Sequence, residues 1–132
     1  MDRDDRERRA AGSIGELDER LRGWAGETVE GLTPGFDAPA AELSDAVSLY
    51  LLDVVPKPPA RGDRRPPLQA EVRYLVTAWA GDPATAHAAL GDLFFGALQH
   101  PDLEVEPLPV PVPTWSAFGV PPRPSFVIKA VV

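Results

Sequence analysis

The sequence predicts an α+β fold in which a small mixed or antiparallel sheet packs against two main helices. Three observations support this fold class. Residues 68–98 run without interruption from an alternating strand pattern through a tight stop into a capped helix. Two further segments, 46–55 and 125–132, are rich in β-branched and aliphatic residues, as strands are. An amphipathic helical pattern follows Ser13, so the predicted order is helix, strand, strand, helix, weak strand, strand.

Composition limits the chain to one domain and removes several functional classes. With 132 residues, 44% hydrophobic and 25% charged, it can build one core. It has no cysteine, which excludes a disulfide framework, a thiolate nucleophile and a thiolate metal site. The first residues are too charged for a secretory signal, and no apolar run is long enough to cross a bilayer, so we expect synthesis in the cytoplasm. We predict a charged, flexible tail or solvated helical extension over residues 1–12 and a single α+β domain over residues 13–132.

The first helix is predicted from a capping box, because Ser13 is followed three residues later by Glu16. Its apolar stripe is Ile14, Leu17, Leu21 and Trp24. The helix is expected to reach about Glu30, with Thr33-Pro34-Gly35 as its stop.

A strand is predicted over residues 46–55, and the segment from Pro56 to Pro67 is a loop with five of the 16 prolines. This loop is expected to be exposed. It is also basic, because it carries four cations and one carboxylate: Lys57, Arg61, Arg64, Arg65 and Asp63.

The long strand that begins at Leu68 alternates between two faces. One face carries Leu68, Ala70, Val72, Tyr74, Val76 and Ala78, and the other begins with Gln69, Glu71 and Arg73. Beyond Arg73 the second face also becomes apolar, so this half should be covered on both sides. A strand this long must bend or protrude from a small domain, and a protruding ribbon exposes backbone groups that another chain can pair with. This is the first indication of an assembly subunit.

The second helix is predicted to start at Pro83 with Asp82 as its N-cap, and Pro101 ends it. Its expected buried stripe is Ala86, Leu90, Leu93, Ala97 and Leu98, widened by Phe94 and Phe95.

The remaining elements are shorter. Residues 103–108 are predicted as a short edge strand, residues around Trp115 and Phe118 as one apolar helical turn, and residues 125–132 as the final strand. This last strand is apolar on both faces except at Lys129, so it must lie inside the sheet or under a neighbouring subunit.

No residue pattern indicates catalysis or a cofactor. His87 and His100 lack the spacing of a metal site or a triad, although an enzyme using His87 is the third functional class considered. Asp102, Glu104 and Glu106 alternate as the surface charges of an edge strand do. Phosphate-loop, dinucleotide, hydrolase-elbow and zincin motifs are missing from the sequence, so we predict no catalytic, metal or cofactor-binding residues.

The charge distribution favours a protein partner. The formal net charge is −7, which disfavours general nucleic-acid binding, whereas a basic loop on an acidic body suits an acidic protein surface. Trp79, Trp115 and Phe118 are more simply explained by core closure than by an interface, since aromatic residues are enriched in both.

The motifs VRYLVTAWAGDPATAHAALGDLF and WSAFGVPPRPSFVIKAVV, with SLYLLDV and the stop at His100-Pro101, resemble one known family. It is the N-terminal domain family of tail-terminator, or cap, proteins from extracellular contractile injection systems, which are phage-tail-like particles. The resemblance runs from Ile14 to Val132. The segment between His100 and Trp115 is shorter than in typical members, and the tail before Ser13 has no clear counterpart.

The resemblance implies a structural, non-enzymatic subunit with a tail-terminator-like fold and no cofactor. It implies a hexameric ring that assembles in the cytoplasm, ends the inner tube and anchors the last sheath layer of a particle that lysis can release. Self, inner-tube and sheath subunits are the implied partners, without nucleic acid or a membrane span. The alternative is the tail-terminator or head-tail joining protein of a contractile-tailed phage. The residues expected at protein interfaces are Arg61, Arg64, Arg65, Leu68, Trp115, Phe118, Val127, Lys129 and Val131.

Overall fold

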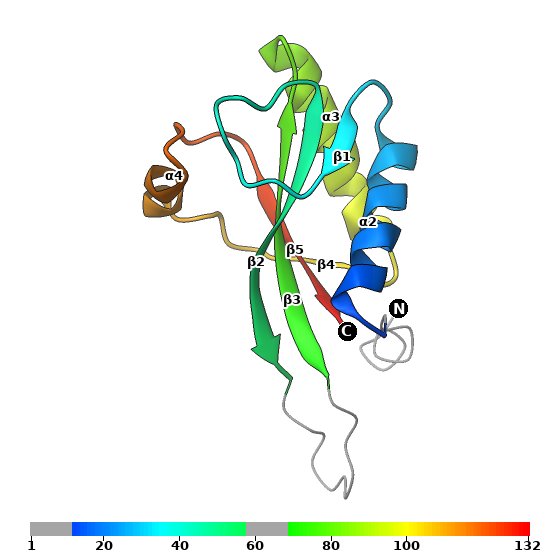
Figure 1. Cartoon of the computed structure of the whole chain (residues 1–132). Helices are drawn as coiled ribbons and strands as arrows, with labels where there is room; N and C mark the ends of the chain where they lie inside the picture. The colour runs from blue at the N-terminus through cyan, green and yellow to red at the C-terminus, as the bar shows by residue number, and fades with distance from the viewer. Residues whose placement is uncertain (1–11, 58–68) are drawn as a thin grey trace, which may run out of the picture.

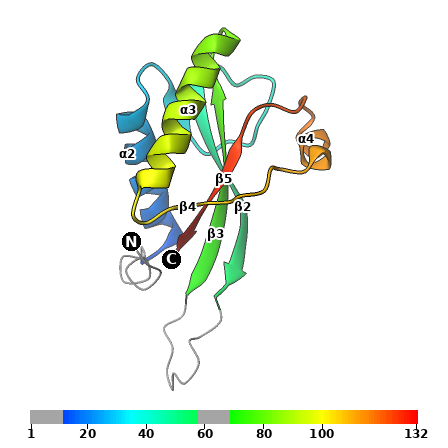
Figure 2. The same cartoon turned by 180° about the vertical axis from the view of Figure 1, so that it is seen from behind.

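Five strands form one mixed sheet, with two long helices on one face and a short helix on the other (Figures 1 and 2). The computed structural model describes residues 12–57 and 69–132. The helices are α2 (Ile14–Thr28), α3 (Pro83–Gln99) and α4 (Val112–Phe118). The strands are β1 (Thr33–Gly35), β2 (Ala46–Pro56), β3 (Ala70–Trp79), β4 (Glu104–Val105) and β5 (Phe126–Val131).

The strand order across the sheet is β1-β2-β3-β5-β4. β1 pairs with β2 in parallel, and the other three pairs are antiparallel. The predicted α+β class with a mixed sheet is therefore confirmed. The final strand lies inside the sheet between β3 and β4, which is one of the two places where an apolar strand of this kind is tolerated.

The larger core lies between the sheet and the two long helices. The alternation predicted for β3 is confirmed, because its face with Val72, Tyr74 and Val76 is completely buried there. The Tyr74 hydroxyl donates a 2.5 Å hydrogen bond to Asp18 of α2, which ties this helix to the middle of the sheet. Burial, followed by this hydrogen bond, raises the pKa of the Tyr74 phenol well above its usual value.

The smaller core lies on the opposite face, where α4 covers part of the sheet. Its buried members are Leu75, Trp79, Trp115, Val120 and Val127. Every residue from Tyr74 to Trp79 is buried, so the second half of β3 is covered on both sides as its sequence predicts. Gly119 ends α4 in the left-handed region at φ 73°, where a residue with a Cβ is strained.

The other halves of β2 and β3 extend as a ribbon beyond the layer formed by α4, and β5 flanks this ribbon on the β3 side as far as Glu71 (Figure 1). The unpaired backbone expected at the start of the long strand is not found on β3, because from Glu71 to Val76 it pairs with β2 on one side and with β5 on the other. Leu68 itself lies outside the described residues, and the observed strand starts at Ala70.

Both predicted helix starts are confirmed by their capping hydrogen bonds. The Ser13 hydroxyl accepts from the Glu16 backbone N–H at 3.1 Å, and the Glu16 carboxylate accepts from the Gly12 N–H. The Asp82 carboxylate accepts from the Thr85 backbone N–H at 3.1 Å at the start of α3.

Three sequence-based expectations need correction. The first helix ends at Thr28, and Thr33–Gly35 forms β1 instead of a helix stop, because the turn at Gly31 (φ 82°) brings these residues alongside β2. Phe95 and Leu98 do not join the buried stripe of α3: they are 64% and 56% exposed, since α3 buries its Ala89 and Leu93 side. Asp102 and Glu106, which were expected to be free surface charges on an edge strand, form ion pairs instead: Asp102 with Arg20 and Glu106 with Arg73.

Candidate protein-interaction surface

The outer edge of β2 lacks a strand partner over most of its length in the described part of the chain. β1 pairs only with Ala46, Val47 and Ser48, so the edge from Leu49 to Pro56 is open. An open edge presents backbone N–H and C=O groups that an incoming strand can bond. We call this segment, Leu49 to Pro56, the β2 edge.

Hydrogen bonding fixes which backbone groups point outward. The Lys57 N–H donates to the Gln69 carbonyl, so Val55 and Glu71, two residues further along the ladder, form a hydrogen-bonded pair. Val54 lies between such pairs, opposite Val72, and its N–H and C=O therefore point toward the open edge. Pro56, two residues after Val54, also lies between hydrogen-bonded pairs. Its missing N–H would have pointed outward, so the proline removes no hydrogen bond between β2 and β3.

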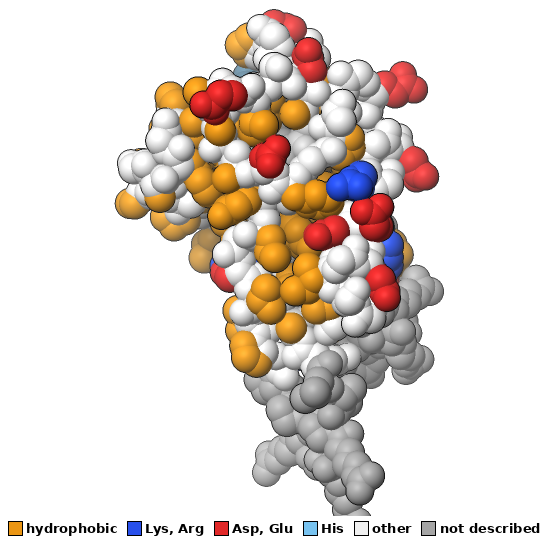
Figure 3. All heavy atoms as spheres, viewed as in Figure 1, with side chains coloured by type: hydrophobic (Ala, Val, Ile, Leu, Met, Phe, Trp, Pro, Cys, Tyr) orange, Lys and Arg blue, Asp and Glu red, His pale blue; other side chains and the backbone are white. Residues whose placement is uncertain are grey.

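Apolar side chains accompany this open backbone. Val54 and Val55 are 47% and 48% exposed, although they are β-branched residues typical of paired strands. Figure 3 shows hydrophobic side chains continuing down the molecule onto the ribbon. Exposed apolar surface beside unpaired backbone is the combination that strand addition covers.

A β-bulge at Leu52 lies in the middle of the β2 edge. The pairing register with β3 shifts between Leu51 and Asp53, so one extra residue sits on β2. Leu52 and Asp53 line a groove of about 430 Å³ whose opposite wall is the proline-rich segment before α4. Leu108, on that wall, is 76% exposed.

An ion-pair network forms one side of this groove. Arg73 donates to Asp53 at 2.6 Å and to both carboxylate oxygens of Glu106 at 2.7 and 2.9 Å. The hydrogen bonds to Glu106, and then those to Asp53, raise the pKa of Arg73 despite partial burial. The other Asp53 oxygen is shielded from solvent and has no hydrogen-bond partner within the described residues. A donor from an incoming chain could satisfy this oxygen.

Sequence-predicted interface residues fall into several environments. Arg61, Arg64, Arg65 and Leu68 lie outside the described residues. Trp115 and Val127 are 3% and 2% exposed, so in this chain they serve the smaller core.

Three predicted interface residues are accessible in part. Phe118 is half-buried, and its ring packs edge-on against Tyr50 of β2 at 5.5 Å. Lys129 is half-buried and lies 3.7 Å from the Glu71 carboxylate on the open face of the sheet. Val131 is half-buried at the end of β5. β4 pairs with β5 only at Ile128 and Lys129, so the last residues of β5 have no β4 partner on that side.

The sequence analysis missed the β2 edge as the main open edge and missed the groove beside it. Strand order decides which edge is open, and strand order is a long-range property. The available signal was Pro56 at the end of an otherwise regular strand, because proline in a strand favours an edge position.

The two histidines do not form a common site. His87 is exposed on α3, whereas His100 ends this helix, packs edge-on against Trp24 and accepts a hydrogen bond from the Asp102 N–H. Burial lowers the pKa of His100.

Within the described residues there is no group of three or more His, Asp or Glu side chains that could hold a metal ion. None of the helices described is both long and apolar enough to cross a bilayer.

Comparisons with known proteins identify the fold. No family model matches the sequence, and no curated protein matches it. Among solved structures, the chain is similar to one from the cryo-EM structure of an extracellular contractile injection system, the PVC sheath/tube terminator in its extended state. The TM-score is 0.76 at 16% sequence identity, and the match covers 92% of this chain and 56% of that chain. The expected tail-terminator-like fold is confirmed, in a chain that spans a little over half of its neighbour.

Proposed function

We propose that this chain is a tail-terminator subunit of a contractile injection system, a structural protein that ends the inner tube and anchors the last sheath layer. The observation that carries the proposal is the fold shared with a sheath/tube terminator over 92% of the chain. The open β2 edge supports it, because a subunit that acts by assembly needs a surface that another chain completes.

The subunits would form a closed ring, and we propose a hexamer. A contact between two different surfaces of adjacent copies closes into a ring when its rotation divides a full turn. Such a ring would be complementary to the last tube and sheath layer on one side and would offer no matching surface to the next layer. Growth would then stop at that ring. The subunit needs no cofactor and no catalytic residue for this role.

The β2 edge is the proposed attachment point for an extended segment of a sheath subunit. The outward N–H and C=O of Val54 would bond this segment, and Val54 and Val55 would bury apolar surface against it. A backbone or side-chain donor near the bulge would satisfy the shielded Asp53 oxygen. The bulge would thereby set the register of the added strand.

The basic loop is proposed to guide the partner electrostatically. Arg61, Arg64 and Arg65 are absent from the described residues, so the argument rests on their charge alone. Replacing all three by serine should weaken capping without changing the urea unfolding of the isolated chain. Unchanged tube lengths and sheath attachment in this triple variant would remove the loop from the mechanism.

Electron microscopy of particles assembled with and without this chain tests the proposed function. We expect uniform tube lengths when the chain is present and variable, longer tubes when it is missing. The second measurement is the oligomeric state of the purified chain, determined from its mass in solution, alone and after tubes and sheaths are added. A chain that stays monomeric with tubes and sheaths present, and leaves their lengths unchanged, would refute the terminator role.

A further inference from the structure

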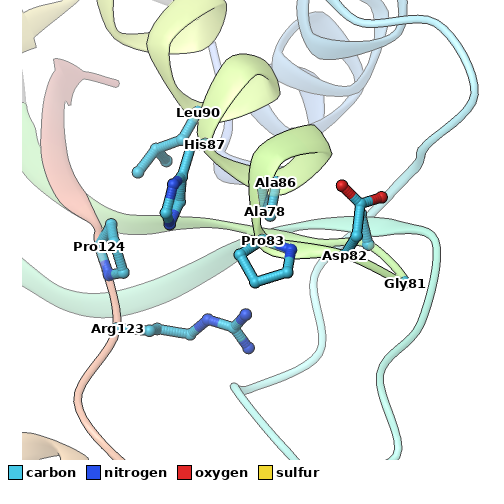
Figure 4. A pocket seen from close by; sticks show the side chains of 10 residues that line it. Ala78, Gly81, Asp82, Pro83, Ala86, His87, Leu90, Arg123 and Pro124 are labelled. Carbon is cyan, nitrogen blue, oxygen red and sulfur yellow. The ribbon is translucent and has the colours of Figure 1, made fainter.

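A hollow at the start of α3 lies apart from the β2 edge and is not used by the proposed function. Its volume is about 380 Å³. The lining residues come from the end of β3, the first turns of α3 and the segment before β5: Ala78, Ala80, Gly81, Asp82, Pro83, Ala86, His87, Leu90, Arg123 and Pro124 (Figure 4).

The hollow exists because small side chains line it. Ala78, Ala80, Gly81 and Ala86 together fill little space where β3 passes into α3. Larger apolar side chains, including Leu90 and Pro124, also line it and offer van der Waals contact.

Arg123 supplies a fixed positive charge to this hollow. Its guanidinium carbon lies 3.5 Å from the centroid of the Trp79 ring, so the side chain is held against an aromatic surface. Stacking of this kind leaves the edge of the guanidinium group, with its N–H donors, available for other partners.

No carboxylate neutralises Arg123 within the described residues, whereas Arg20, Arg22, Arg73 and Lys129 all have carboxylate partners there. The nearest candidate by position, Asp82, caps α3 through Thr85, and its carboxylate points away from the Arg123 guanidinium (Figure 4). Partial burial lowers the pKa of Arg123 with no opposing charge interaction. Arg123 therefore differs from Arg20, Arg22, Arg73 and Lys129 in having no carboxylate partner among the described residues, although the net charge of the chain is −7.

We propose that this hollow binds the carboxylate of a glutamate side chain from an extended segment of a partner protein, with Arg123 as its bidentate ligand. A planar guanidinium matches a carboxylate with two parallel hydrogen bonds. The imidazole of His87, which points from α3 toward the same space, provides a second polar contact (Figure 4). An apolar residue next to the glutamate would pack against Leu90 and Pro124.

A polyanion does not fit the site. Nucleic acid requires several cations in a row, whereas Arg123 is the one arginine or lysine among the residues that line this hollow. A single carboxylate with an apolar neighbour matches both the charge and the lining. The site does not depend on the terminator role, because it is defined by contacts within one chain.

The experiment titrates the full chain with N-acetyl-leucyl-glutamate amide and follows binding by NMR, using the Arg123 Nε–H and the backbone amides of residues 81–87. The matched probe is the leucyl-glutamine analogue, which has the same shape and no charge. We expect saturable shifts with the glutamate probe and a weakening of about tenfold or more with Arg123→Gln, since hydrogen bonds to charged groups contribute about 1.5–3 kcal/mol.

Two control variants separate the site from general effects of charge and stability. Arg22→Gln removes an exposed cation paired with Glu19 and should leave the shifts unchanged. Arg123→Lys keeps the charge and loses the planar fork, so it should bind more weakly than the wild type. Equal shifts with the glutamine probe, equal binding by Arg123→Gln, or tighter binding of inorganic phosphate than of the glutamate probe would each overturn the proposal.

Discussion

Replacing Val54 by proline tests whether the β2 edge is the surface that assembly uses. The Val54 N–H points away from β3, so proline removes a donor that an added strand would need and no bond of the existing ladder. Val55→Pro is the matched control, because the Val55 N–H belongs to the hydrogen-bonded pair with Glu71.

The two variants should differ clearly in stability. Val55→Pro loses a ladder hydrogen bond and leaves the Glu71 carbonyl unpaired, which together cost about 3 kcal/mol. Val54→Pro keeps the ladder, and its half-exposed side chain loses little packing, so the expected cost is about 1 kcal/mol, chiefly from the fixed φ of proline. A domain of this size has a stability of about 5–15 kcal/mol, so Val54→Pro should remain folded.

Urea unfolding measures both costs, and electron microscopy of assembled particles measures capping. We expect Val54→Pro to unfold almost as the wild type does and yet to release the sheath or leave tubes uncapped. The reasoning is refuted if Val54→Pro caps particles normally, or if it destabilises the isolated chain as much as Val55→Pro does.

Three further predictions concern the fold that carries the edge. Arg73→Met should cost about 2 kcal/mol in urea unfolding at neutral pH, because the Asp53 and Glu106 carboxylates lose their cation. The pKa of Tyr74 is raised in the folded chain, so its contribution is complete below the unfolded value of about 10 and is lost as pH rises above it. Urea unfolding of Tyr74→Phe should accordingly show a shallower loss of stability above pH 10 than the wild type. Gly119→Ala should destabilise the chain by about 1 kcal/mol in urea unfolding, since φ of 73° strains any residue with a Cβ, and an unchanged midpoint would contradict this.

Local patterns predicted most of the fold because their causes are local. Ser13 and Asp82 were identified as caps because capping depends on side chains within one turn. The change of pattern after Arg73 located the point where β3 becomes buried on both faces, since alternation reports burial directly.

Features that depend on strand order could not be predicted in the same way. β1 is three residues long and contains proline and glycine, so no strand pattern exists for it, and it forms through its parallel neighbour β2. Phe95 and Leu98 fit a helical stripe by spacing, but the side of α3 that meets the sheet is set by tertiary packing.

The sequence predicted that an open sheet edge exists, but it did not predict which strand carries this edge. An exposed sheet edge was expected from the length of the strand after Leu68, whereas the open edge belongs to its neighbour β2. The surroundings of the shielded Asp53 oxygen and the lining of the Arg123 hollow come from residues far apart in the sequence, so no local sequence pattern predicts either feature.

The unequal coverage of β3 gives the domain a stiff end and a compliant end. Where the two long helices and α4 enclose the sheet, three layers resist any change in its twist. The ribbon end of β2 and β3 is less buried, so fewer packing contacts oppose a change in its curvature. A segment added to the β2 edge would therefore meet the more compliant part of the domain, while the enclosed end keeps a constant shape.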